Sequence, residues 1–197
     1  MNDPTTALGT DRKTTRRAVL GGVGAVCLGS IAGCLDGDEA SAPDPISIDE
    51  DQSCDQCTMV IGNHPGPAGQ AHYEDPTEVF DEDRPAQFCS SLCTYAFTFD
   101  NESTADPEGI HLTDYSSVDY TIDPSDENET ISRHLEADAF ADVTGLTLVA
   151  DSDVEGAMGA SILPFSDADE AESFQEEYGG EVYDHDDITQ EFVMSLM

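Results

Sequence analysis

The residues best suited to chemistry in this sequence are four cysteines arranged as two close pairs. Cys54 and Cys57 are separated by two residues, and Cys89 and Cys93 by three. A tight turn lets both sulfurs of a C-x2-C pair point at one centre, and residues four apart share a face of a helix. The combination is typical of a thiolate metal site, and thiolate sulfur suits Zn(II) and the softer Cu(I). The spacing therefore predicts that the four sulfurs converge on a metal ion.

The same four cysteines also fit two other uses. In an oxidising compartment they could form disulfides between the two pairs, whereas a bond within either pair would close a small and strained ring. A C-x-x-C pair also serves in thiol–disulfide exchange, in which an accessible thiol of low pKa attacks. Spacing alone leaves the metal site, the disulfides and the redox pair open.

The N-terminal region has the composition of an export signal. Arg16 and Arg17 precede an uncharged run over residues 18–33, which ends in small residues directly before Cys34. This run is too short and too rich in Gly for a membrane-spanning helix. Paired arginines are typical of a twin-arginine signal, and Cys34 resembles the lipidated cysteine of a lipobox. We expect residues 1–33 to be removed on export, and Cys34 to anchor the chain by lipid to the outer face of the cell membrane.

The charge of the chain limits its partners. Its 197 residues carry a formal net charge of −37, and beyond residue 33 the only basic residues are Arg84 and Arg133. Binding to nucleic acid or to anionic lipid depends on Lys and Arg, so the composition argues against both. Such an acidic surface needs dense screening by salt and resembles that of proteins from extreme halophiles. We therefore attribute the acidity to the solvent rather than to a calcium site.

The elements that would position the cysteines fall into two units of one domain over residues 53–190. Residues 34–52 are acidic and contain two prolines, which predicts a tether ahead of the folded part. The first unit is expected at about 53–105 and the second at about 135–190. The polar stretch over residues 100–130 is expected to link them and to hold short strand pieces.

Each unit is predicted to contain one helix next to short strands. The first helix is expected to begin at Ser90 or Ser91 and to run to about Phe99. The second has apolar residues at helical spacing from Ala168 and is expected to stop at the glycine pair that begins with Gly179. A short closing strand is expected to follow the second helix.

A spacing of phenylalanines repeats in the two units. Phe88 and Phe97 lie nine residues apart across the first helix, and Phe165 and Phe174 lie nine apart across the second. Each unit therefore reads as two strands, a helix and a final strand. The fold class that we predict is α+β, built from two small tandem ββαβ-like units.

Around the first cysteine pair the sequence resembles the NosL family, copper-binding lipoproteins that are accessory to nitrous oxide reductase. Residues 54–61 are similar to the family motif Cys-x-x-Cys-Gly-Met and the strand after it, with Thr58 where the family usually has Gly. A Pro-containing loop and a preceding lipobox are also typical of that family. The resemblance continues through residues 64–71, 88–89, 157–159, 164–165 and 170–182.

The resemblance implies an extracytoplasmic carrier of Cu(I) rather than an enzyme, folded as two ββαβ units. Its partners would be a copper-inserting transporter complex and the apo form of nitrous oxide reductase. Copper binding in the family is associated with Met and Cys, and sometimes His. Met158 and Met59 match the family's methionines, so we predict that Met158, with help from Met59, holds transferable Cu(I). Ala160 and Ser161 stand where some members place a His.

The four cysteines would either join that copper site or hold a structural ion such as Zn(II). The second pair, Cys89 and Cys93, resembles the cysteine pattern of small heavy-metal-trafficking domains with a treble-clef-like shape. Two alternative functions remain at this point: a surface module that binds zinc or another heavy metal through four cysteines, and a thiol–disulfide exchange protein. No catalytic residue is predicted, since no G-x-S-x-G, H-E-x-x-H or phosphate-binding Gly motif occurs.

Overall fold

The computed structural model describes residues 42–124, 128–157 and 159–197. The predicted signal with Arg16 and Arg17, the predicted lipidation site Cys34 and the predicted ligand Met158 lie outside these residues. In the described ranges, no helix combines the length and the apolar character needed to cross a membrane.

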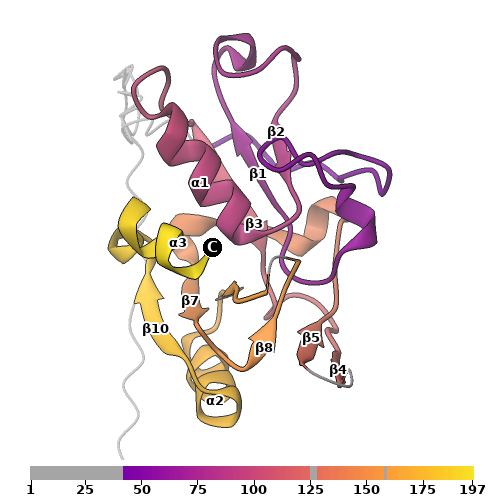
Figure 1. Cartoon of the computed structure of the whole chain (residues 1–197), viewed down its shortest axis with the longest axis vertical. Helices are drawn as coiled ribbons and strands as arrows, with labels where there is room; N and C mark the ends of the chain where they lie inside the picture. Colours follow the sequence, from indigo (N-terminus) through magenta and orange to yellow (C-terminus); the bar gives the residue numbers. More distant parts are fainter. Residues whose placement is uncertain (1–41, 125–127, 158) are drawn as a thin grey trace, which may run out of the picture. The chain divides into compact units, whose positions relative to one another are not determined.

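The first sheet has four antiparallel strands in the order β2-β1-β3-β6 (Figure 1). Strand β1 lies in the middle, where Gly69 faces Phe88 on one side and Leu112 on the other. All four residues of β1 are buried, and helix α1 packs against β1 and β2. The elements are β1 (Gly69–His72), β2 (Ala86–Phe88), α1 (Ser91–Asn101), β3 (Gly109–Thr113) and β6 (Phe140–Asp142).

Helix α1 begins where a serine caps it. The Ser90 side chain accepts a hydrogen bond from the backbone N–H of Cys93, which satisfies one of the free donors of the first turn. The residues from Ser91 to Thr98 are all buried. Such a helix needs partners on every side. Ser91 supplies one link, because its hydroxyl donates to the carbonyl of Ile162 in the second half of the chain at 2.7 Å.

The second sheet has three antiparallel strands in the order β10-β7-β9. Its helix, α2, begins at an Asp167 cap that accepts from the backbone of Asp169 and Glu170, and it ends at Gly179, whose φ of 73° favours glycine. The predicted start and end of this helix are confirmed. The elements are β7 (Thr147–Ala150), β9 (Ile162–Phe165), α2 (Ala168–Tyr178) and β10 (Glu181–Asp184).

The two units share one topology. In each, the first strand lies between the second and the last, as β2-β1-β3 and as β9-β7-β10. The repeated phenylalanines also make the same contact, because the ring centroids of Phe88 and Phe97 are 5.1 Å apart and those of Phe165 and Phe174 are 5.2 Å apart. The prediction of two tandem ββαβ units in an α+β fold is therefore confirmed.

The expected boundary of the first unit was too early. Strand β3 (Gly109–Thr113) falls within the stretch predicted as a linker, yet it completes the first ββαβ unit. Strand β6, which we assigned to the second unit, pairs with β3 instead. Both strands are short, and a run of three to five residues does not reveal its pairing partner in the sequence.

The expected tether ended too late. Ile48 is 4% exposed, and its backbone N–H donates to the carbonyl of Leu135. The backbone N–H of Ile46 donates to the buried side chain of Gln70. Two isoleucines in an acidic, Pro-containing stretch were the sequence signal for this packing.

The remaining elements are short. The strand that the family resemblance implies directly after the first cysteine motif is an isolated bridge at Val60 followed by a 3-10 turn, and residues 76–78 form another 3-10 turn. Helix α3 packs against α1, and the third sheet has the order β4-β5-β8. These elements are β4 (Ile122–Pro124), β5 (Glu129–Ile131), β8 (Val154–Glu155) and α3 (Gln190–Leu196), with 3-10 turns at Ile61–Asn63, Pro76–Glu78, Ala137–Ala139, Val143–Gly145 and His185–Asp187.

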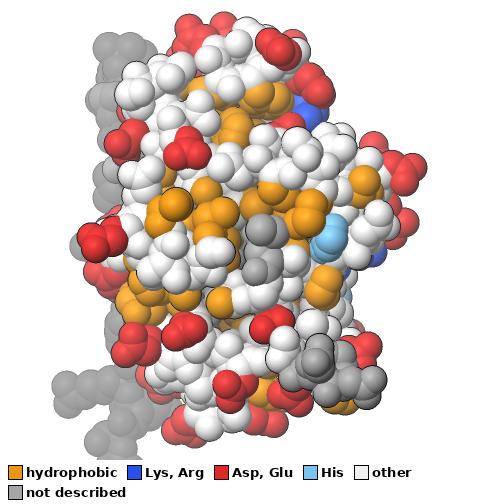
Figure 2. Space-filling view, in the orientation of Figure 1, with side chains coloured by type: hydrophobic (Ala, Val, Ile, Leu, Met, Phe, Trp, Pro, Cys, Tyr) orange, Lys and Arg blue, Asp and Glu red, His pale blue; other side chains and the backbone are white. Residues whose placement is uncertain are grey.

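The surface of the described part reflects the composition. Figure 2 shows one face on which Asp and Glu side chains lie mostly near the edges, while hydrophobic side chains gather across the middle. Lys and Arg are nearly absent from this view. Among the described residues only Arg84 and Arg133 take part in ion pairs as Lys or Arg partners.

Candidate metal centre

The four cysteines predicted as a metal site lie together. The Sγ atoms of Cys54, Cys57, Cys89 and Cys93 are all within 4.8 Å of one another. Cys57 Sγ is 3.4 Å from Cys89 Sγ, which in turn is 3.9 Å from Cys93 Sγ. Three of the cysteines are buried, and Cys57 is partly exposed. The cluster therefore reaches the surface through one thiol.

Two segments far apart in the sequence form this cluster. Cys89 directly follows strand β2, and the Ser90 cap turns the chain into α1, so Cys93 lies one helical turn further on. Cys54 and Cys57 lie on a tight loop in which the backbone N–H of Thr58 donates to the carbonyl of Cys54. The sulfurs of the loop therefore face those at the start of the helix.

Thr58 closes this loop in an unusual conformation. Its φ is 65°, in the left-handed region, where a β-branched side chain is strained. The family motif usually has Gly at this position, and the conformation explains why glycine suits it.

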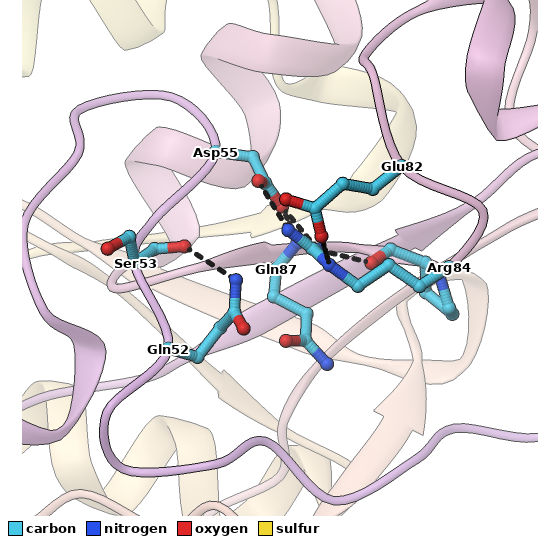
Figure 3. A network of polar contacts seen from close by, with 7 residues as sticks. Gln52, Ser53, Asp55, Glu82, Arg84 and Gln87 are labelled. Atoms are coloured by element: carbon cyan, nitrogen blue, oxygen red, sulfur yellow. Dashed lines mark hydrogen bonds and ion pairs between the residues drawn. The ribbon is translucent and has the colours of Figure 1, made fainter.

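A partly buried ion pair fixes the loop to the first sheet (Figure 3). Arg84 donates through both terminal nitrogens to the carboxylate of Asp55, at 2.7 and 2.8 Å. The same carboxylate accepts the backbone N–H of Gln87 at 2.7 Å, and the backbone N–H of Asp55 donates to the carbonyl of Gln87. Asp55 lies between the two loop cysteines, and Gln87 lies two residues before Cys89. The ion pair therefore sets the distance between the two halves of the cysteine cluster.

The sequence did not single out this ion pair. The only indication of it in the sequence was that Arg84 is one of two basic residues beyond the predicted export segment. With so few basic residues, the position of Arg84 is more constrained than that of an ordinary arginine. A guanidinium that binds a carboxylate with both terminal nitrogens orients it more firmly than a single contact.

Three of the thiols differ in how readily they lose a proton. Hydrogen bonds from the Cys89 and Cys93 thiols lower the pKa of Cys54 to about 2. The bond to Cys54 raises the pKa of Cys93 to about 12 and raises the pKa of Cys89 as well. A negative charge at Cys54 thus opposes ionisation of its neighbours, so further thiolates need a cation among the sulfurs to stabilise them.

The separations fit a metal–thiolate centre. Four sulfurs at about 2.3 Å from one ion would stand about 3.8 Å apart in a tetrahedron. The Cys57–Cys89 and Cys89–Cys93 separations of their Sγ atoms, 3.4 and 3.9 Å, lie on either side of that value. A disulfide needs sulfurs at about 2.05 Å. All four cysteines of the described part are free. The arrangement thus favours the metal site over the two-disulfide alternative.

Of the two predicted methionine ligands, Met59 lies among the described residues and Met158 does not. Met59 is partly buried and packs against the hydrophobic cluster that includes Cys54, Cys89 and Cys93. Ala157 packs against the same cluster. Met158 lies outside the described residues, so its role as a ligand stays a prediction.

Comparisons with known proteins agree with the sequence-based resemblance. The family model described as NosL matches residues 45–193. The chain is 22% identical over 161 residues to the copper-binding lipoprotein NosL of Stutzerimonas stutzeri, covering 81% of this chain and 74% of the relative. It is similar to the crystal structure of the copper chaperone NosL from Shewanella denitrificans, with a TM-score of 0.60 and 27% identity, covering 76% of this chain and 98% of that one.

The two relatives are named as a copper-binding lipoprotein and a copper chaperone, in agreement with the prediction of a carrier rather than an enzyme. The match spans both ββαβ units and the cysteine cluster between residues 54 and 93. It also begins at residue 45, where the structure shows that the folded part has begun. The chain is a member of the NosL family.

Proposed function

We propose that this chain is an exported, lipid-anchored protein that binds Cu(I) at its four-cysteine cluster and delivers it for the maturation of nitrous oxide reductase. The observation that carries the proposal is the convergence of four free thiols within 4.8 Å. Sulfur ligands suit Cu(I), which is a soft ion. Relatives named as a copper-binding lipoprotein and a copper chaperone support copper as the cargo.

The exposure of the thiols supports transfer. Three cysteines are buried, whereas Cys57 is partly exposed and would be the first sulfur that a partner's ligand could reach. Replacement of one ligand at a time lets an ion pass between proteins without entering water. We propose that Cys57 exchanges first and that Met158 and Met59 assist as softer, more easily released sulfur ligands.

A structural zinc site is the second candidate. Four cysteines that close around one ion are typical of structural Zn(II), and three of them are buried here. Such a site would make folding depend on the metal, because its binding energy becomes folding energy. The hydrophobic cluster around these cysteines also contains Ala71, Phe88 and Phe97 of the first sheet and α1, and this apolar packing argues for a fold that does not need the ion.

Thiol–disulfide exchange fits less well. The thiol whose pKa is lowered, Cys54, is 1% exposed, so a disulfide of a substrate protein could not reach it. Cys57, the partly exposed member, has the thiol of Cys89 as its side-chain neighbour, at 3.4 Å, and a second thiol does not activate it as a base or a cation would.

The test is a competition titration of the reduced full chain in high salt, without oxygen. Cu(I) is titrated against a chromophoric chelator and Zn(II) against another, for the native chain, Cys57→Ser, Met59→Ala and Met158→Ala. Met194→Ala is the matched control, because Met194 is 63% exposed on α3. We expect tight one-to-one Cu(I) that weakens at least tenfold in Cys57→Ser and is unchanged in Met194→Ala.

Two results would contradict the proposal. One is weak Cu(I) binding together with tight Zn(II) binding and a fold that is lost on chelation, which would identify a structural zinc module. The other is Cu(I) affinity that does not change in any of the cysteine or methionine variants. Delivery is tested separately, by mixing the Cu(I)-loaded chain with apo-nitrous oxide reductase and following the reductase's copper content.

Anchoring and export rest on the N-terminal sequence. Replacement Cys34→Ala should move the protein from the membrane fraction to the soluble fraction, and Arg16→Lys with Arg17→Lys should hold it inside the cell. A protein that fractionates with the membrane after Cys34→Ala would refute the lipid anchor.

A further inference from the structure

The second ββαβ unit carries a cavity of about 380 Å³ of a different chemical character from the cysteine cluster. Aromatic rings of Tyr120, Phe174 and Tyr178 line it together with the carboxylates of three acidic residues. The acidic residues are Asp119, Glu170 and Glu177. Aromatic faces and carboxylates are the two groups that attract organic cations most strongly.

One wall of the cavity lies on the part of the second helix that corresponds to the position of Cys93 in the first. The helix caps Ser90 and Asp167 are 77 positions apart, as are Phe88 and Phe165. By the same shift, Cys93 corresponds to Glu170, which lines the cavity.

A loop that precedes the unit lies over each helix. In the first unit, the loop of Cys54 and Cys57 lies over the face of α1, where the side chain of Gln56 donates to Asp100. In the second unit, the loop over residues 114–120 lies over α2, and the side chain of Asp114 accepts the backbone N–H of Ser166 at 2.8 Å. Asp100 corresponds to Glu177, again a residue of the cavity.

The aromatic rings around the cavity lie at different angles to one another and do not form one stack. The centroids of Phe174 and Tyr178 are 4.7 Å apart at an interplanar angle of 38°, whereas Tyr120 meets Phe174 edge to face at 6.5 Å. Tyr115 closes the inner end and is 1% exposed. Rings at different angles around one space can present their negative faces to one cation.

The charges at the rim have no basic partner. The ion pairs of Lys and Arg in residues 42–124, 128–157 and 159–197 use Asp55, Glu82 and Glu50, so none involves Asp119, Glu170 or Glu177. Within the same ranges only the four cysteines gather closely enough to hold a small metal ion. Because the three carboxylates of the cavity do not gather closely enough to hold one small metal ion, they suit a broader cation.

We infer that this cavity binds an alkylated ammonium ion, with the ammonium against the partly exposed rings of Tyr120 and Tyr178 above the buried Phe174, and its charge balanced by Glu170 and Glu177. An ammonium without N–H groups needs no directed hydrogen bonds, which suits a wall of rings with carboxylates at a distance. The site is separate from the cysteine cluster and does not depend on a metal.

The experiment compares choline with 3,3-dimethylbutan-1-ol, its uncharged isostere, by NMR titration of the full isotope-labelled chain in high salt. We expect choline to bind at least fivefold more tightly than the alcohol, with shifts confined to the residues of the cavity. Equal binding of the two compounds, or no saturable binding of choline, would overturn the inference.

Variants separate the site from its surroundings. Tyr178→Leu and Glu177→Gln should each weaken choline binding about three- to tenfold. Tyr178 is partly exposed and Glu177 exposed, so neither replaced side chain is itself buried. Glu176→Gln, on the same helix but outside the cavity, is the matched control and should bind as the native chain does. Cys57→Ser should also leave choline binding unchanged, and an equal loss in Glu176→Gln would overturn the assignment.

Discussion

The ion pair between Arg84 and Asp55 yields the most specific prediction about the metal site. Replacement Arg84→Gln removes two hydrogen bonds to a carboxylate that is 14% exposed and leaves the charge of Asp55 without its partner. Asp55 also accepts the backbone N–H of Gln87, so the loop would lose orientation as well as charge compensation.

The structure allows the magnitude to be worked out. Hydrogen bonds to charged groups contribute about 1.5–3 kcal/mol, and breaking a buried pair costs about 3–5 kcal/mol. Arg84 is 20% exposed, so solvent offsets part of this loss, and we expect Arg84→Gln to lower the free energy of unfolding by about 2 kcal/mol. Loss of a residue that orients a ligand-bearing loop typically weakens metal binding by about 10–100-fold.

The assay combines chelator competition with thermal unfolding followed by circular dichroism, both in high salt and at a temperature where each variant is folded. Arg84→Lys should fall between the native chain and Arg84→Gln, because Lys keeps the charge but not the paired contacts. Arg133→Gln is the matched control, since Arg133 makes a single long ion pair, at 3.7 Å, with a Glu50 that is 80% exposed, and one hydrogen bond to the carbonyl of His64 at 3.1 Å. Its stability should change by less than about 1 kcal/mol.

Two results would refute this reasoning. Metal affinity in Arg84→Gln within twofold of the native value would show that the ion pair does not position the cysteines. An equal loss in Arg133→Gln would show that the effect comes from net charge rather than from the loop.

Two further predictions concern stability. Thr58→Gly should raise the free energy of unfolding by about 0.5–1 kcal/mol in chemical denaturation, because Thr58 has a φ of 65°. Thr104→Gly is the control: Thr104 lies exposed in the turn after α1 without a positive φ, so glycine there should lower the free energy of unfolding. A loss in Thr58→Gly would contradict the strain. Burial and the neighbouring His111 lower the pKa of His72 to about 4, and burial lowers the pKa of His111. Since the unfolded chain binds protons from about pH 6.5, stability should fall by up to about 3 kcal/mol between pH 6.5 and 4. His72→Gln should flatten that part of the pH profile of thermal unfolding, and an unchanged profile would contradict it.

The helices could be predicted because their signals are local. Ser90 and Asp167 are cap residues at the start of periodic segments, and Gly179 ends the second helix with a positive φ. Because Cys89 and Cys93 are four positions apart, a helix at these residues predicts that both side chains lie on the same face. The repeated phenylalanines predicted the tandem units because they make the same contact in each.

The strand pairings and the loop could not be predicted in the same way. Strand β6 has three residues and pairs with β3, and nothing in its sequence distinguishes that partner from a strand of the second unit. The contact of Arg84 with Asp55 joins residues 29 positions apart and depends on where β2 begins. Ile48 packs against the domain from within an acidic stretch whose composition predicts a tether. Each of these depends on tertiary contacts rather than on local preference.

The central claim is that the four cysteines bind Cu(I) together, and X-ray absorption at the copper edge of the Cu(I)-loaded chain tests it most directly. We expect sulfur neighbours at about 2.3 Å, without a nitrogen or oxygen shell, and fewer sulfur neighbours in Cys57→Ser. Met158→Ala, measured alongside, shows whether a thioether adds to the thiolates. A spectrum dominated by nitrogen or oxygen ligands, or one that does not change in Cys57→Ser, would contradict a copper site at this cluster.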